Sequence, residues 1–192
     1  PCGYEILDTI TPQYICDLIS WGAIGARTTE SQVHRQLVSG LSMPVGFKNG
    51  TGGSITLAVD AIISAGFPHC FMGITDNGEP AICKTIGNNN CHIILRGSNN
   101  GPNYYSENIK EIEKILLLKN IIPKIMVDCS HGNSNKIHTN QPIVLENIIQ
   151  QIINNRTKTP IFGVMIESNI NEGNQKLIEK KYLKKGGSIT DA

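Results

Sequence analysis

Short apolar runs alternate with amphipathic stretches along the whole chain, and this alternation is the strongest constraint on its fold. The pattern is typical of βα units, in which each strand of a parallel sheet is followed by a helix. We therefore expect an α/β fold. The predicted strands are Tyr4–Asp8, Gly22–Arg27, Pro44–Lys48, His92–Arg96, Lys124–Asp128 and Ile161–Glu167.

Four segments between these strands have helical signals. Thr29 to Gln32 fits a capping box, and the apolar residues Val33, Leu37, Val38 and Leu41 follow it. A second stripe, Ile55, Val59, Ile62 and Ile63, ends before Gly66, which is a candidate C-cap. The remaining helices are expected around Ile109, Ile112 and Leu116, ahead of Pro123, and over Pro142 to Ile153.

The interval between Lys48 and Arg96 is too long for one helix. Two short apolar runs, Cys70–Thr75 and Ala81–Thr85, flank Asp76-Asn77-Gly78, which predicts an inserted β-hairpin. Six βα strands in succession favour a (β/α)8 TIM barrel that is incomplete, because complete barrels have eight strands and ~250 residues. A doubly wound sheet is the alternative, but the sequence has no Gly-x-Gly-x-x-Gly and Gly50-Thr51-Gly52-Gly53 lacks the P-loop lysine.

Composition narrows the classes of function. With 17 Lys+Arg against 16 Asp+Glu, the net charge of +1 argues against a nucleic-acid partner held by bulk electrostatics. The sequence has no apolar run of the ~20 residues that a membrane span needs. Its six cysteines form no CxxC pair and no zinc-finger spacing, so we expect reduced thiols and a cytoplasmic protein.

Charged or metal-competent residues follow nearly every predicted strand, at the position where barrel enzymes carry their active sites. Arg27, Lys48 and Arg96 would bring three cations to one mouth, which indicates an anionic ligand, most simply a phosphorylated one. His131, Glu167 and Asp191 offer one imidazole and two carboxylates, a set suited to one divalent ion such as Mn, Fe, Co or Zn. Each residue alone could equally be a solvated charge or a structural histidine.

Other catalytic classes find little support. The sequence has no Gly-x-Ser-x-Gly nucleophile elbow, and Cys129 near His131 is the one cysteine with an obvious activating neighbour. His34, His69, His92 and His138 lie on a helix, at strand starts or in a polar loop, and we assign them no chemistry. By contrast, the segment from Asp128 to Ser134 is densely polar directly after an apolar strand, which favours a functional His131.

Several blocks resemble the type I, microbial class of 3-deoxy-D-arabino-heptulosonate 7-phosphate (DAHP) synthases. They run over residues 21–32 (WGAIGARTTESQ), 44–50 (PVGFKNG), 92–97 (HIILRG), 128–134 (DCSHGNS), 167–169 (ESN), 172–175 (EGNQ) and 188–192 (SITDA). The resemblance covers essentially the whole chain. It implies a (β/α)8 barrel of which residues 1–192 supply strands three to eight as a single domain truncated at both ends.

The resemblance also implies an activity. These transferases condense phosphoenolpyruvate with erythrose 4-phosphate and release phosphate, as the first step toward chorismate and the aromatic amino acids. Because two strands and the closing segments are missing, we expect the isolated 192 residues to be inactive. Barrel edges left open in this way are an aggregation liability.

Site roles carry over residue by residue. Arg27, Lys48 and Arg96 match the phosphoenolpyruvate-binding cations of the family. The Ala26 backbone matches a position beside the phosphate of the same substrate, and Glu5 lies nearby. His131, Glu167 and Asp191 match three of four metal ligands, and the resemblance assigns Lys48 and His131 to catalysis. The family's Gly-Pro-Cys ligand segment and its Lys-Pro-Arg-Thr motif for erythrose 4-phosphate do not occur here, and Gly52 replaces a usual aspartate.

The resemblance further implies feedback inhibition by an aromatic amino acid. Gln13, Ser42, Phe71 and Gly73 match effector-site positions, and Gly73 stands where phenylalanine-sensitive relatives have serine. Together with the segments after Asp128 and Glu167, this favours tyrosine as the inhibitor. The full-length protein is expected to be a homodimer or homotetramer.

Three other functions compete with this hypothesis. A 3-deoxy-octulosonate 8-phosphate synthase would use the same anion and metal chemistry with arabinose 5-phosphate, but its sequence blocks differ. A non-catalytic effector-binding or assembly domain could retain the scaffold, since fold does not dictate function. A metal-dependent barrel hydrolase would bring several histidines to the metal, and no His-x-His occurs in this sequence.

Overall fold

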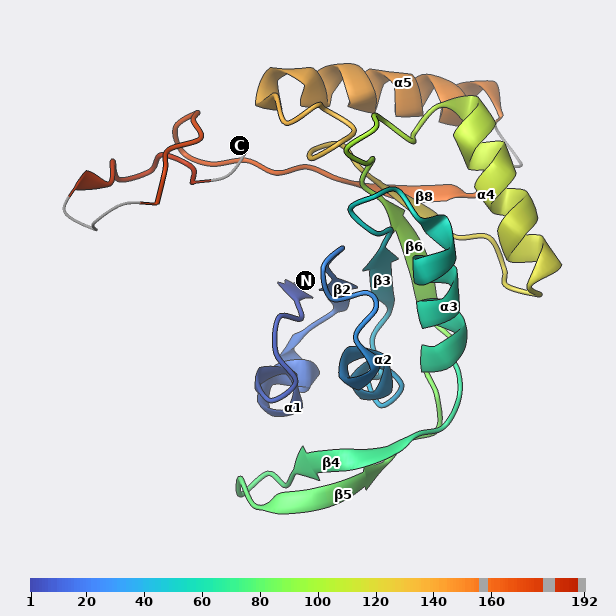
Figure 1. Ribbon diagram of the computed structural model, residues 1–192, viewed down its shortest axis with the longest axis vertical. Coiled ribbons are helices and arrows are strands. Elements are labelled where there is room, and N and C mark those ends of the chain that lie inside the picture. Colours follow the sequence, from blue (N-terminus) through green and yellow to red (C-terminus); the bar gives the residue numbers. More distant parts are fainter. Residues whose placement is uncertain (156–158, 178–181, 190–192) are drawn as a thin grey trace. The chain divides into compact units, whose positions relative to one another are not determined.

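The computed structural model describes residues 1–155, 159–177 and 182–189 and resolves them into two compact units, Pro1–Ile94 and Leu95–Ala192. Strands and helices alternate along the chain in both units (Figure 1). The boundary between the units falls within a strand, β6 (Cys91–Leu95). The mixed α/β class with parallel strands is as predicted.

The first unit contains four parallel strands in the order β1, β2, β3 and β6. They are β1 (Gly3–Glu5), β2 (Trp21–Ile24), β3 (Val45–Lys48) and β6, and their registers pair Glu5 with Ala23, Ile24 with Phe47 and Lys48 with Ile94. Every residue of β3 and β6 is buried, as expected for central parallel strands. The carboxyl ends of these neighbouring strands therefore share one edge.

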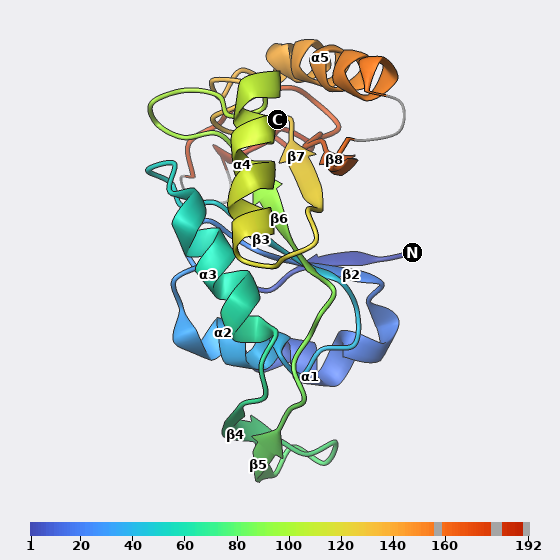
Figure 2. The same ribbon diagram turned by 90° about the vertical axis from the view of Figure 1, so that its right-hand side faces the viewer.

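Helices α1 (Thr11–Ile15), α2 (Gln32–Val38) and α3 (Ile55–Ala65) connect these strands. Strands β4 (Cys70–Ile74) and β5 (Pro80–Lys84) form an antiparallel hairpin that projects from the unit beyond α1 and α2 (Figure 2). Its turn is closed by a hydrogen bond from the Thr75 amide to the Glu79 carbonyl at 2.8 Å, and Gly78 has φ +80°. The predicted hairpin is confirmed.

The second unit contains the parallel pair β7 (Ile125–Asp128) and β8 (Ile161–Met165), in which Asp128 pairs with Met165. Helix α4 (Ser106–Leu118) precedes β7, and α5 (Gln141–Asn154) connects β7 to β8. A short 3-10 turn over His138–Asn140 precedes α5. Ile109, Ile112 and Leu116 are the buried residues of α4, which confirms the predicted stripe.

All six predicted strands exist, but four end earlier than predicted. The β6 strand stops at Leu95, one residue before the predicted end at Arg96. The β1 strand stops at Glu5 because the Asp8 carboxylate accepts hydrogen bonds from the amides of Ile10 and Thr11 and starts a turn. The β2 strand stops at Ile24, where the Gly25 carbonyl accepts from the amides of the next turn. The β8 strand stops at Met165, two residues before Glu167.

The predicted capping box at Thr29 to Gln32 is wrong. Helix α2 begins at Gln32 itself with Ser31 as its N-cap, and the Ser31 hydroxyl lies 2.7 Å from Nδ1 of His34. The buried face of α2 consists of His34, Leu37 and Val38, whereas Val33 is 55% exposed. Helix α1 was not predicted at all. The complete eight-stranded barrel and the single-domain assignment stay predictions.

Candidate functional site

Four of the predicted substrate-binding residues lie in the first unit, at or just beyond the carboxyl ends of β1, β2 and β3. Glu5 ends β1, Ala26 and Arg27 follow β2, and Lys48 ends β3. Lys48 is 6% exposed, whereas Arg27 and Glu5 are exposed. Lys48 and Arg27 thus lie at and just beyond the carboxyl ends of two neighbouring strands.

A buried threonine joins the loop after β2 to the end of β3. The hydroxyl of Thr29, which is 0% exposed, lies 2.7 Å from the Lys48 carbonyl oxygen and 3.0 Å from that of Gly25. The Nε of Arg35 donates to the Thr29 carbonyl at 2.8 Å. These bonds hold the segment that carries Ala26 and Arg27 against Lys48.

Glycine at position 25 leaves room for Glu5. A Cβ at Gly25 would lie 2.7 Å from Oε1 of Glu5, so a larger residue would displace this carboxylate. Gly52 is different, because a Cβ there would meet nothing within 4 Å among the described residues. The position at which Gly52 replaces the family's usual aspartate therefore faces open space.

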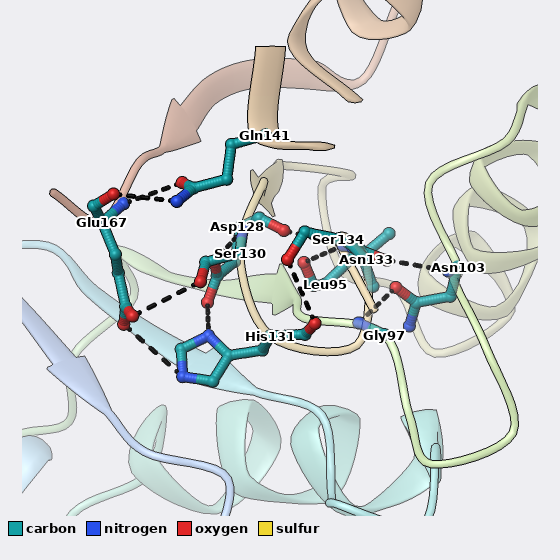
Figure 3. A network of polar contacts seen from close by, with 10 residues as sticks. All are labelled: Leu95, Gly97, Asn103, Asp128, Ser130, His131, Asn133, Ser134, Gln141 and Glu167. Carbon is teal, nitrogen blue, oxygen red and sulfur yellow. Dashed lines mark hydrogen bonds and ion pairs between the residues drawn. The ribbon is translucent and has the colours of Figure 1, made fainter. Parts of the chain in front are cut away.

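In the second unit, a buried aspartate orients the predicted histidine (Figure 3). Asp128 ends β7 and is 0% exposed. Its Oδ2 lies 2.9 Å from Nδ1 of His131, and its Oδ1 accepts a hydrogen bond of 2.9 Å from the Ser130 amide. A carboxylate at Nδ1 favours a hydrogen on that nitrogen, which leaves Nε2 available as a ligand or acceptor.

Glu167 faces the same imidazole. Its Oε1 lies 3.4 Å from Nε2 of His131, and its Oε2 accepts from the Ser130 hydroxyl at 3.3 Å (Figure 3). The Gln141 side chain fixes the backbone of Glu167 through two hydrogen bonds, donating to its carbonyl at 2.8 Å and accepting from its amide at 3.0 Å. His131 and Glu167 are therefore brought together as predicted.

Close backbone packing fixes the loops that follow β6 and β7. The Gly132 amide donates to the Arg96 carbonyl at 3.0 Å, and a Cβ at Gly97, where φ is +72°, would lie 2.5 Å from the Asn133 amide nitrogen. Only glycine fits such an approach at positive φ. Asn133 also donates to the carbonyls of Leu95 and Asp128, at 3.0 and 2.8 Å. Arg96, 8% exposed, starts the first of these loops.

The donors around His131 fit a divalent metal. Nε2 of His131 and Oε1 of Glu167 point toward each other, and Asp128 supplies the outer hydrogen bond that metal-binding histidines commonly have. Within residues 1–155, 159–177 and 182–189, no three His, Cys, Asp or Glu side chains gather closely enough to hold a metal ion. The predicted third ligand, Asp191, lies outside the described residues.

Cys129 follows Asp128 directly, and its surroundings disfavour the thiolate form. Burial, followed by the negative charge of Asp128, raises the pKa of its thiol to about 11. The thiol therefore stays protonated at neutral pH, and the thiolate is the nucleophilic form.

Two of the four predicted effector residues, Gln13 and Phe71, line a separate cavity of the first unit. This cavity has a volume of about 360 Å³, and Gln13, Leu37, Leu41, Phe71 and Cys83 are among its lining residues. Gly73 lies behind this wall, since a Cβ on it would collide with the Cys83 sulfur and lie 2.7 Å from Oε1 of Gln13. Ser42 is exposed next to Leu41.

Sequence reasoning missed the supporting residues of the site. Asp128, Ser130, Asn133 and Gln141 were not assigned roles, although all four orient His131, Glu167 or their loops. The polar density after β7 was the available signal for three of them. Gln141 had no such signal, because it lies 26 residues from Glu167 at the start of α5.

Comparison with known proteins shows the family to which this chain belongs. The model of the DAHP synthetase I family matches residues 1–192, so the chain belongs to this family. A solved structure, a phospho-2-dehydro-3-deoxyheptonate aldolase from Francisella tularensis, superposes with a TM-score of 0.91 at 53% identity. It covers 100% of this chain, which in turn covers 55% of that structure.

Curated relatives agree on the family but differ in their effector. A tyrosine-inhibited phospho-2-dehydro-3-deoxyheptonate aldolase from Schizosaccharomyces pombe is 53% identical over 100% of this chain and 52% of its own length. A Phe-sensitive one from Escherichia coli is also 53% identical, over 100% of this chain and 54% of its own length. The chain thus spans about half the length of these relatives, and overall identity does not select an effector.

Among the described residues, no helix has the length and apolar character that crossing a membrane requires.

Proposed function

We propose that the full-length protein containing this chain condenses phosphoenolpyruvate with erythrose 4-phosphate and water to form DAHP and phosphate. The observation that carries this proposal is the oriented pair of His131 and Glu167, held by Asp128 and Gln141, in a chain that belongs to the DAHP synthetase I family. In a complete (β/α)8 barrel, the carboxyl ends of all strands meet at one mouth.

The cations bind and position the substrates in this proposal. Arg27, Lys48 and Arg96 hold the phosphate and carboxylate of phosphoenolpyruvate, and Ala26 and Glu5 lie beside them. Two phosphorylated molecules repel each other, so cations that neutralise this charge are needed to bring them within reacting distance. The hydrogen bond from the Thr29 hydroxyl to the Lys48 carbonyl supports this role, because it holds the segment that carries Arg27 against Lys48.

His131, Glu167 and Asp191 would hold one divalent ion, with Mn, Fe, Co and Zn as candidates. When bound, such an ion polarises the aldehyde carbonyl of erythrose 4-phosphate as a Lewis acid. The protein's contribution is to fix the ligands: Asp128 keeps Nε2 of His131 directed at Glu167, and Ser130 holds the second carboxylate oxygen.

We infer that the cavity lined by Gln13 and Phe71 binds an aromatic amino acid, with tyrosine as the favoured inhibitor. Its volume of about 360 Å³ suits a ligand of this size, and its wall combines apolar side chains with the Gln13 amide, the Thr85 hydroxyl and the Lys84 ammonium group. The preference for tyrosine comes from position 73, where this chain has glycine and phenylalanine-sensitive relatives have serine. We expect the full-length protein to be a homodimer or homotetramer.

The decisive experiment measures phosphate release by the full-length protein. Phosphoenolpyruvate is supplied with erythrose 4-phosphate or with arabinose 5-phosphate, each with and without a chelator. Release with erythrose 4-phosphate alone that the chelator abolishes is the expected result. Release with arabinose 5-phosphate would indicate an octulosonate 8-phosphate synthase, and no release with either sugar would favour a non-catalytic domain.

A further inference from the structure

A small hollow between the loops that follow β6 and β7 is lined by Arg96 of the proposed site and by residues that have no role in the proposed reaction. It lies in the second unit and has a volume of about 210 Å³, well above the roughly 10–15 Å³ that one water molecule requires. There is therefore room for a small anion. The residues that line it are Arg96, Ser98, Asn99, Gly132, Asn135 and Lys136.

Backbone contacts build this hollow. The Gly132 amide donates to the Arg96 carbonyl at 3.0 Å, and a Cβ at Gly132 would lie 2.5 Å from the Ser98 amide nitrogen. Glycine at position 132 therefore allows the two loops to touch through their backbones. The walls of the hollow consequently come from two loops that are fixed to each other.

A turn of left-handed residues brings Lys136 back to this point. His131, Asn135 and Lys136 have φ values of +52°, +54° and +58°, a conformation that non-glycine residues rarely adopt. The Lys136 amide donates to the His131 carbonyl at 2.8 Å and closes the turn. Lys136 therefore lines the same hollow as Arg96 while its backbone is bonded to the candidate metal-binding histidine.

The chemistry of the lining fits a phosphate group. Among the lining residues, Arg96 carries a guanidinium group, Lys136 an ammonium group, and Asn99 and Asn135 carry amides that can donate hydrogen bonds. None of the six described lining residues carries a carboxylate. Guanidinium and ammonium groups form charge-assisted hydrogen bonds to phosphate oxygens, which are about twice as strong as neutral ones.

We propose that Lys136, together with Arg96, binds the phosphate group of a phosphorylated substrate in this hollow. Lys136 is thus a further substrate-binding residue of the proposed reaction, and the inference rests on that proposed function. Both substrates carry a phosphate monoester. The substrate whose KM changes in the Lys136 variant is the one whose phosphate Lys136 binds.

The test uses steady-state kinetics of the full-length protein with three variants. Lys136→Gln removes the charge and keeps a polar side chain of similar reach, Lys136→Arg keeps the charge, and Lys114→Gln removes an exposed lysine from α4 as a matched control. We expect Lys136→Gln to raise the KM of one substrate on the order of tenfold, equivalent to ~1.4 kcal/mol, with kcat nearly unchanged. Lys136→Arg should raise this KM less than Lys136→Gln does, because it keeps the charge. Lys114→Gln should resemble the unsubstituted protein.

Inhibition by inorganic phosphate gives a second readout. The Lys136→Gln variant should require a higher phosphate concentration for half-inhibition, and added salt should narrow its difference from the unsubstituted protein. Unchanged KM values for both substrates and unchanged phosphate inhibition in Lys136→Gln would overturn the inference. If the unsubstituted protein forms no product, the proposed function itself fails, so the two failures are distinguishable.

Discussion

Nδ1 of His131 lies 2.9 Å from Oδ2 of the fully buried Asp128, while Nε2 of the same imidazole lies 3.4 Å from Oε1 of Glu167. The two carboxylates therefore face opposite nitrogens of one ring. The buried carboxylate of Asp128 sets the orientation of the ring. The more exposed carboxylate of Glu167 faces the ring nitrogen that is available as a metal ligand. Asp128 is thus a positioning residue for a site whose proposed ligands are His131 and Glu167.

Replacing Asp128 with asparagine should weaken metal binding. An amide cannot supply the negative charge that fixes the tautomer of His131, and loss of such an outer partner reduces metal affinity about 10–100-fold. Titration of the metal-free full-length protein with Mn²⁺ would measure this change. The control is Asp60→Asn, on the exposed side of α3. Equal affinities in the two variants would remove the positioning role from Asp128.

Replacing Thr29 with valine should destabilise the fold. Valine keeps the shape of the side chain but removes the hydroxyl that donates to the Lys48 carbonyl at 2.7 Å in a fully buried position. An unsatisfied buried acceptor costs about 1–3 kcal/mol. Urea denaturation would show the loss, and the exposed Thr51→Val variant should stay within about 0.5 kcal/mol of the unsubstituted protein. A stable Thr29→Val protein would mean that this bond contributes little.

The sequence predicted the elements of the fold better than their ends. The apolar runs at Val45 and Cys91 are strands because a buried parallel strand needs nearly continuous apolar side chains, and this pattern is local. The ends depend on side chains that compete for backbone hydrogen bonds. Asp8 stops the first strand through the amides of Ile10 and Thr11, and the periodicity of apolar residues carries no information about such a turn.

The sequence could predict the site residues that follow the ends of strands. It could not predict the residues that support them from distant positions in the chain. His131 and Glu167 follow the ends of β7 and β8, so topology alone brings them near each other. Thr29 was misread as a capping residue because its real acceptor, the Lys48 carbonyl, lies 19 residues away. Contacts at this separation form only after the strands have paired, and a local motif cannot reveal them.

Acidification should reduce the contribution of Asp8 to stability. The backbone hydrogen bonds from Thr11 and Ile10 lower the pKa of its carboxyl below the ordinary value of 3.8. Because the pKa is lower in the folded state, the stabilisation is complete above the unfolded pKa and disappears as pH falls through the folded pKa. The Asp8→Ala variant should therefore be less stable than the unsubstituted protein at neutral pH, and this difference should narrow in acid.

Urea denaturation of both full-length proteins across this pH range checks the prediction. Asp60→Ala serves as the control, since Asp60 lies on the exposed side of α3. A difference between Asp8→Ala and the unsubstituted protein that stays constant down to the most acidic pH would show that the charge of Asp8 does not stabilise the start of α1.

Replacing Gly73 with serine should change both stability and the effector response. Gly73 pairs with Ala81 in the hairpin, and a Cβ on it would collide with the Cys83 sulfur and lie 2.7 Å from Oε1 of Gln13. That same oxygen accepts the hydrogen bond of the Ile74 amide at 2.9 Å. A serine must therefore displace two side chains that line the cavity, and such overpacking costs about 1–3 kcal/mol.

We expect Gly73→Ser to unfold at lower urea concentration and to weaken inhibition of the full-length enzyme by tyrosine. Adding Cys83→Ala removes the colliding sulfur and should restore part of the stability, which a double-mutant cycle would measure as a coupling between the two positions. Gly52→Ser is the matched control, because a Cβ there meets nothing within 4 Å among the described residues. If Gly73→Ser keeps both the stability and the tyrosine response of the unsubstituted protein, the hairpin accommodates a side chain at this position and Gly73 does not determine the choice of effector.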